Sequence, residues 1–218
     1  MREDHIDTSP ILPSASSCVI FPMQRIVGVD IGIRNMSICL LEVPIAKSQL
    51  ACPLARAEQL LAMRGKLGWE HVSLCSATAN ANHCSHGALL NSIVAYVRER
   101  SDLFEWATDV VIEAQPAARM KIVAAGLFAS VRFVNPGAKM CFQSAKRKLA
   151  WGMGLAEFGD VSTYRGRKRA AVALLAKLLR CPEVLKELGS KKDDAADSFL
   201  HALNYAATGS GAGRRRLA

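Results

Sequence analysis

The sequence predicts an α/β fold in which helices flank a mixed five-stranded sheet, with an antiparallel three-strand meander first and parallel strands after it. Two short β-branched apolar runs, 26–31 and 36–43, flank a turn, and residues 69–75 alternate like a third strand. Residues 109–134 then read as strand, helix and strand, an order that implies a right-handed crossover and parallel pairing.

The first half of the chain supplies the meander and one helix. Gly32, Arg34 and Asn35 form the turn of the first hairpin. Residues 47–68 look like an insertion with a short Ala/Leu-rich helix in its middle. After a polar loop at 76–86, apolar residues recur at helical spacing up to about Phe104, which predicts the first long helix.

The second half supplies the parallel strands and the remaining helices. The strand at 109–114 is followed by Pro116, which is suited to opening a helix over 117–131. A fifth strand is expected at 131–134, before the turn Asn135-Pro136-Gly137. The last two helices are expected at 166–180 and 193–207.

Length and composition indicate one domain with tails. A chain of 218 residues that is 50% hydrophobic can bury one good core, and its apolar runs are too short to span a membrane. We expect a disordered N-terminal extension at 1–24, one domain at 25–207 and a flexible basic tail at 208–218. The extension contains prolines, serines and acids, which fits neither a secretory signal nor a transit peptide.

Charge and cysteine content limit the partners and the compartment. The 28 basic residues exceed the 19 acidic ones, and the formal net charge is +9. Clusters of basic residues suit a polyanionic partner such as nucleic acid, although such runs are often only solvated faces. The seven scattered cysteines show no CxxC spacing, which indicates a reducing, intracellular and thus cytoplasmic location.

Acidic residues stand at the ends of two predicted strands. Asp30 lies inside the otherwise apolar first strand, near its end, and Glu113 ends Val110-Val111-Ile112. Ligand sites gather at such strand ends in α/β sheets, but a solvent-facing Asp or a solubilising Glu would look the same. Gly28 and Gly32 beside Asp30 would leave the backbone bare for a substrate to approach.

The last predicted helix carries a polar stripe. At a 3.6-residue period Asp194, Asp197, His201 and Asn204 fall within about 80° of one another, and the opposite side is apolar. Two carboxylates one turn apart repel, so their presence suggests a cation, although a first-turn Asp also complements the helix dipole. Facing carboxylates need a positive partner, and divalent ions with oxygen ligands are the usual one.

These motifs together resemble a known family. VDIGIRN at 29–35, IEAQ at 112–115 and KKDDAADSFLHAL at 191–203 resemble the RuvC-like Holliday junction resolvases of the ribonuclease-H-like superfamily, particularly the poxviral and fungal-mitochondrial branch. The resemblance covers roughly 25–207 and implies a ribonuclease-H-like nuclease domain there. The N-terminal extension, the insertion at 47–68 and the Arg-rich tail depart from compact members.

The resemblance implies a two-metal endonuclease that resolves four-way DNA junctions. Asp30, Glu113, Asp194 and Asp197 would hold two Mg²⁺ ions, for which Mn²⁺ would substitute, with Asp193 as an additional acid. In such sites one ion generates hydroxide and the other steadies the leaving oxygen. Lys192 and Lys191 would neutralise developing charge or hold the scissile strand, unless they are ordinary surface lysines.

The DNA arms and the oligomer are further expectations. The basic residues expected to bind DNA are Lys146, Arg147, Lys148, Arg165, Arg167, Lys168, Arg169 and Lys191. Phe142, Trp151 and Tyr164 among them could stack or wedge at an unpaired junction centre. Paired symmetric nicks favour a homodimer with twofold symmetry, and a viral protein of this family would act at the viral replication site.

Four alternatives remain open. VDIGIRN also resembles the phosphate hairpin of sugar kinases and actin-like ATPases, although we find no second glycine-rich hairpin. A different ribonuclease-H-like nuclease would share the metals but cut RNA–DNA hybrid or transposon ends. A non-enzymatic nucleic-acid scaffold would use the acids only for folding. An irregular zinc site is the fourth, with its candidate ligands His71, Cys75, His83, Cys84 and His86.

Overall fold

The protein is described here from a computed structural model that covers residues 22–45, 52–75, 83–145 and 161–208. Its centre is a five-stranded sheet in the order β3-β2-β1-β4-β5. The strands are β1 (Met23–Asp30), β2 (Met36–Pro44), β3 (Leu67–Val72), β4 (Asp109–Ala114) and β5 (Lys139–Ser144). β1, β2 and β3 pair antiparallel, whereas β1 with β4 and β4 with β5 pair parallel. The predicted fold class is confirmed.

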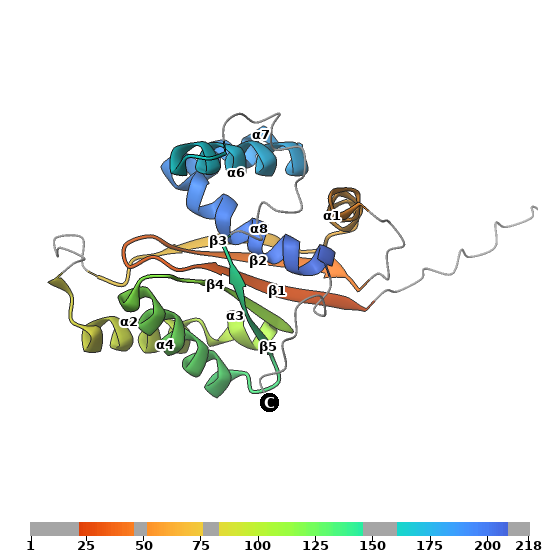
Figure 1. Cartoon of the computed structure of the whole chain (residues 1–218). Coiled ribbons are helices and arrows are strands. Elements are labelled where there is room, and N and C mark those ends of the chain that lie inside the picture. Colours follow the sequence, from red (N-terminus) through yellow and green to blue (C-terminus); the bar gives the residue numbers. More distant parts are fainter. Residues whose placement is uncertain (1–21, 46–51, 76–82, 146–160, 209–218) are drawn as a thin grey trace, which may run out of the picture.

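Helices cover both faces of the sheet (Figure 1). One face carries α1 (Pro53–Ala62), α6 (Tyr164–Leu179), α7 (Pro182–Leu188) and α8 (Lys192–Thr208), with the short 3₁₀ turn η3 (Gly189–Lys191) before α8. The other face carries α2 (His86–Glu99), α3 (Ser101–Trp106) and α4 (Ala118–Val134). Strand side chains alternate between two cores: Ile26 and Val111 pack on the α8 side, and Val27 and Ile112 on the α4 side.

The parallel register brings the two strand-end acids to one edge. Val29 of β1 stands opposite Ile112 of β4, so Asp30 and Glu113 are the next residues on neighbouring strands. Helix α8 lies across β1 and β2, on the face of the sheet that also carries α1, α6 and α7 (Figure 1). The beginning of α8 therefore ends up beside the carboxyl ends of β1 and β4.

Gly28 makes room for α8 and not for a substrate, which corrects the expectation, whereas Gly32 lines the pocket described below. A Cβ on Gly28 would lie 2.4 Å from the Ser198 carbonyl oxygen and 2.9 Å from Ala202 Cβ, both in α8. A Cβ on Gly32 would meet the Asn35 carbonyl oxygen across the hairpin turn at 2.5 Å. Gly28 thus lets α8 approach β1 closely.

The fifth strand was predicted at the wrong place. Residues 131–134 are the last turn of α4, because Val131 continues the buried helical row of Val123 and Leu127. β5 follows the Asn135-Pro136-Gly137 turn instead, at Lys139–Ser144. Its sequence KMCFQS buries a glutamine and exposes a phenylalanine, so its apolar pattern gives little sign of a strand.

Other boundaries shift by smaller amounts. The helix expected up to Phe104 is divided at Arg100 into α2 and α3, and the third strand ends at Val72 and not at 75. α7 was not predicted. β1 begins at Met23, and residues 1–21 and 209–218 of the predicted tails lie outside the described residues. Within the described residues, no helix is long and apolar enough to cross a membrane.

Candidate active site

The four predicted acids line one pocket. Asp30 ends β1, Glu113 is next to last in β4, and Asp194 and Asp197 stand in the first turns of α8. The cavity measures about 990 Å³. The remaining lining residues include the hairpin turn at 31–35, Pro116 and Met120 of the β4–α4 region, and Tyr164, Arg167 and Lys168 of α6. The three distant stretches of the chain that carry these acids therefore contribute side chains to one pocket.

The polar stripe of α8 faces the sheet and is buried. Asp197, His201 and Asn204 have 5%, 0% and 4% of their surface exposed. The opposite side is apolar and also buried, because α6 and α1 pack over it. α8 is thus the central helix of its layer, and its carboxylates point into the pocket instead of into open solvent.

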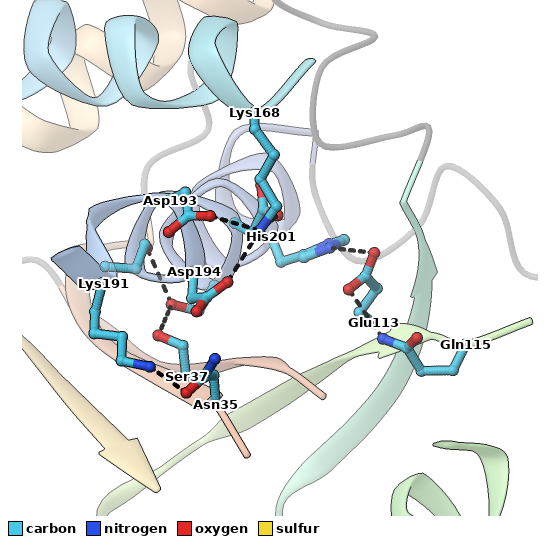
Figure 2. A network of polar contacts seen from close by, with 12 residues as sticks. Asn35, Ser37, Glu113, Gln115, Lys168, Lys191, Asp193, Asp194 and His201 are labelled. Carbon is cyan, nitrogen blue, oxygen red and sulfur yellow. Dashed lines mark hydrogen bonds and ion pairs between the residues drawn. The ribbon is translucent and has the colours of Figure 1, made fainter. Parts of the chain in front are cut away.

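Lys168 is the cation at the centre of the acidic cluster (Figure 2). Its ammonium nitrogen lies 3.0 Å from Asp194 Oδ1, 3.2 Å from Asp193 Oδ2 and 3.4 Å from Asp197 Oδ2. Burial alone would lower the pKa of Lys168, but the three carboxylates raise it well above its usual value. Lys168 is therefore charged and neutralises part of the cluster.

The sequence assigned Lys168 to DNA and missed its place among the acids. A weak signal was present, because Lys168 precedes the buried residues Ala171, Leu175 and Leu178 at helical spacing. Lys168 therefore lies at the border of the packed face of α6, whereas Arg165 and Arg169 are exposed.

Glu113 stands at the end of a second polar chain (Figure 2). Its Oε2 accepts a hydrogen bond from Gln115 Nε2 at 3.0 Å, and its Oε1 lies 3.8 Å from His201 Nε2. His201 Nδ1 lies 2.7 Å from Gln143 Oε1, and Gln143 Nε2 donates to Asn204 Oδ1 at 2.7 Å. The sequence indicated His201 and Asn204 but missed Gln143, because it placed the fifth strand elsewhere.

Lys191 and Asp193 contact residues that line the pocket and so lie at its rim, and Lys192 stands between them in the chain. Lys191 Nζ hydrogen-bonds the side chain of Asn35 in the hairpin turn, and so fixes η3 to the first hairpin (Figure 2). Lys192 is exposed at the start of α8, and Asp193 bonds Lys168 but does not line the pocket. His71 of β3 belongs to the same region: burial lowers its pKa, and the nearby Asp194 partly opposes this effect.

Comparison with solved structures identifies the architecture. No protein-family model and no curated protein sequence matches the chain. A structure of Thermus thermophilus RuvC in complex with Holliday junction substrate aligns with a TM-score of 0.52 and 14% identity over 84% of this chain and 93% of that one. The fold is RuvC-like.

Two further structures align over similar lengths. A second structure of Thermus thermophilus RuvC aligns with a TM-score of 0.51 and 14% identity over 86% of this chain and 98% of that one. Fowlpox virus resolvase with its substrate Holliday junction DNA aligns at 0.48 and 15% identity over 85% and 98%. The fold assignment rests on the two RuvC structures, which have the higher scores.

Only some of the basic residues predicted to bind DNA line the pocket. In the RuvC-like fold of this chain, Arg167 and Lys168 line the pocket, and Arg165 and Arg169 are exposed on the same end of α6. Arg167 also donates a 2.7 Å hydrogen bond to the Ser162 carbonyl oxygen. Lys146, Arg147, Lys148 and Trp151 lie outside the described residues.

The carboxylate oxygens at the pocket suit a divalent ion, but their arrangement in this structure is not a complete coordination site. Among the described residues, no group of three or more His, Cys, Asp or Glu side chains has the geometry to hold a metal ion. This also applies to the described members of the zinc set proposed above. At the acidic cluster, the ammonium of Lys168 lies among three carboxylates, whose hard oxygens are the ligands that Mg²⁺ and Mn²⁺ prefer.

Proposed function

We propose that the protein is a divalent-metal-dependent endonuclease that resolves four-way DNA junctions by paired nicks. One observation carries the proposal: Asp30, Glu113, Asp194 and Asp197 come from three distant stretches and line a single pocket in a RuvC-like fold. A fold used only as a binding scaffold gives no reason to collect four carboxylates in one cavity, because they repel one another.

The four carboxylates would hold the ions, with Asp193 available at the rim. When bound, two divalent ions would supply a hydroxide nucleophile and stabilise the leaving oxygen. Lys168 offsets part of the charge of the α8 carboxylates, and its ammonium stands at the pocket wall where a phosphate would enter. Lys191 and Lys192 lie at the rim, where they would contact the scissile strand.

The first turns of α6 would bind the DNA backbone. Arg165, Arg167 and Arg169 place three guanidinium groups next to the pocket, and Tyr164 is 67% exposed beside them, so it could stack on an unpaired base. We propose the same role for Lys146, Arg147, Lys148 and Lys191. Since a four-way junction has twofold symmetry, paired nicks call for a homodimer with the same symmetry.

The decisive experiment compares substrates and a matched pair of proteins. Wild type and Asp194→Asn are incubated with Mg²⁺ or Mn²⁺ on a synthetic four-way junction, a duplex of the same sequence and an RNA–DNA hybrid. We expect symmetric nicks in the junction only, dependent on the metal and absent in Asp194→Asn. Preferential cutting of the hybrid would instead assign the pocket to a different ribonuclease-H-like nuclease. No cutting of any substrate would refute the proposed enzyme.

A further inference from the structure

A fully buried imidazole nitrogen without a partner faces one of the proposed metal ligands. His201 has none of its surface exposed, and its Nε2 has no hydrogen-bond partner in the described part of the chain. The carboxylate oxygen Glu113 Oε1 lies 3.8 Å from this nitrogen, which is too long for a hydrogen bond. Leaving a buried polar atom unsatisfied costs about 1–3 kcal/mol, so the arrangement calls for a ligand between the two atoms.

The hydrogen bonds behind His201 determine which nitrogen carries the proton. Gln143 donates through Nε2 to Asn204 Oδ1, which leaves Gln143 Oε1 as an acceptor for His201 Nδ1. With the proton on Nδ1, that nitrogen donates to Gln143 Oε1, and Nε2 would present its lone pair to a cation beside Glu113. Metal-binding histidines are usually held in this way, with the distal N–H donated to an oxygen.

The spacing of the two donors is close to that of ligands on one ion. Neighbouring ligands with bonds of about 2.1 Å lie roughly 3.0–3.4 Å apart in octahedral or tetrahedral geometry. The observed 3.8 Å needs a closing movement of under about 1 Å. Glu113 lines the pocket, so an ion that enters the cavity reaches its carboxylate, and the cavity leaves room for water or phosphate oxygens as further ligands.

We propose that His201 Nε2 and Glu113 Oε1 together bind one divalent ion, and that this nitrogen ligand makes that position selective for first-row transition ions over Mg²⁺. Imidazole suits transition ions better than Mg²⁺, which prefers an all-oxygen environment. The inference rests on the proposed metal-dependent function but adds a ligand from outside the four acids. Gln143 and Asn204 act as positioning residues that hold the ring.

The test uses the DNA-free protein, so that it does not depend on nuclease activity. Electron spin-echo envelope modulation of bound Mn²⁺ detects a directly coordinated imidazole nitrogen. We expect this signal in wild type and its loss in His201→Gln. Calorimetry should show a Kd for Mn²⁺ that rises about tenfold or more in that variant, with a much smaller change for Mg²⁺.

Two matched control variants test whether any disturbance of α8, or another histidine, accounts for the signal. Tyr205→Phe removes the 2.7 Å hydrogen bond to Asp109 from the same helix and should leave Mn²⁺ binding unchanged. His71→Gln removes a histidine whose pKa Asp194 influences and should keep the nitrogen signal. A signal that persists in His201→Gln and disappears in His71→Gln would overturn the proposal.

The wild-type spectrum decides even if His201→Gln fails to fold. Bound Mn²⁺ without nitrogen coupling overturns the His201 ligand and leaves the proposed nuclease intact, because oxygen ligands alone would then hold the ion. Binding of neither Mn²⁺ nor Mg²⁺ overturns both. A His201-dependent nitrogen signal in a protein that cuts no junction supports the metal position and refutes only the proposed function.

Discussion

Replacing Gly28 with alanine should damage the fold and the candidate active site together. The new Cβ would lie 2.4 Å from the Ser198 carbonyl oxygen, whereas ordinary contacts begin at about 3.4 Å, so α8 must move by roughly 1 Å. Overpacking of this kind costs about 1–3 kcal/mol. For a domain of this size that corresponds to a fall in Tm of about 2–12 °C.

The same displacement should lower activity beyond the loss of stability. α8 carries Asp194 and Asp197, and a shift of about 1 Å in catalytic groups can cost roughly a hundredfold in rate. Urea unfolding followed by circular dichroism measures the loss of stability, and junction cleavage well below the Tm measures the loss of activity.

Gly68→Ala is the matched control for Gly28→Ala. Both glycines lie inside strands of the sheet, but a Cβ on Gly68 meets nothing within 4 Å. We expect this variant to be unchanged or more stable by up to about 1 kcal/mol, because alanine is less costly to order than glycine. If Gly28→Ala unfolded within about 0.5 kcal/mol of wild type, the close approach of α8 to β1 would be refuted.

Three further predictions concern the charged groups. Asp194→Asn should lower cleavage about 10²–10³-fold while junction affinity in a gel-shift titration stays within a few-fold; a loss confined to affinity would contradict a role in metal binding. Lys168→Met should destabilise the metal-free protein by about 1–3 kcal/mol, because it leaves the carboxylates of α8 without their cation, and added Mg²⁺ should restore part of the lost Tm. Arg169→Met, at an exposed position of the same helix, should neither lower the Tm nor respond to Mg²⁺ in this way. Equal Tm values for the two variants would exclude the proposed role of Lys168. Arg165→Gln should reduce the slope of log affinity against log salt by about 1, whereas Lys177→Gln at the other end of α6 should not change it; identical slopes would remove α6 from the DNA interface.

The carboxylates were predictable because they follow from local patterns. Asp30 and Glu113 end apolar runs, and parallel pairing brings such ends together without any knowledge of the packing. The stripe of Asp194, Asp197 and His201 follows from helical periodicity alone. To predict that these acids share a pocket, only the fold class was needed in addition, and the order of strands and helices indicated it.

The partners of these acids were not predictable in the same way. Lys168 meets Asp194 because α6 packs on α8, a contact that no spacing within either segment reveals. Gln143 was missed because the strand was placed at 131–134, where the buried row of α4 in fact continues. Gly28 was interpreted as an opening for substrate, although its missing side chain makes space for a helix about 170 residues later in the chain.

The position of α8 at the end of the described chain has a consequence for biosynthesis. The sheet is complete once β5 has been made, but two of the four acids and His201 arrive only with residues 192–208. A polypeptide that stops before α8 contains the sequence of all five described strands and lacks Asp194, Asp197 and His201. Under the proposed function, a polypeptide truncated before residue 192 would therefore be unable to cleave DNA.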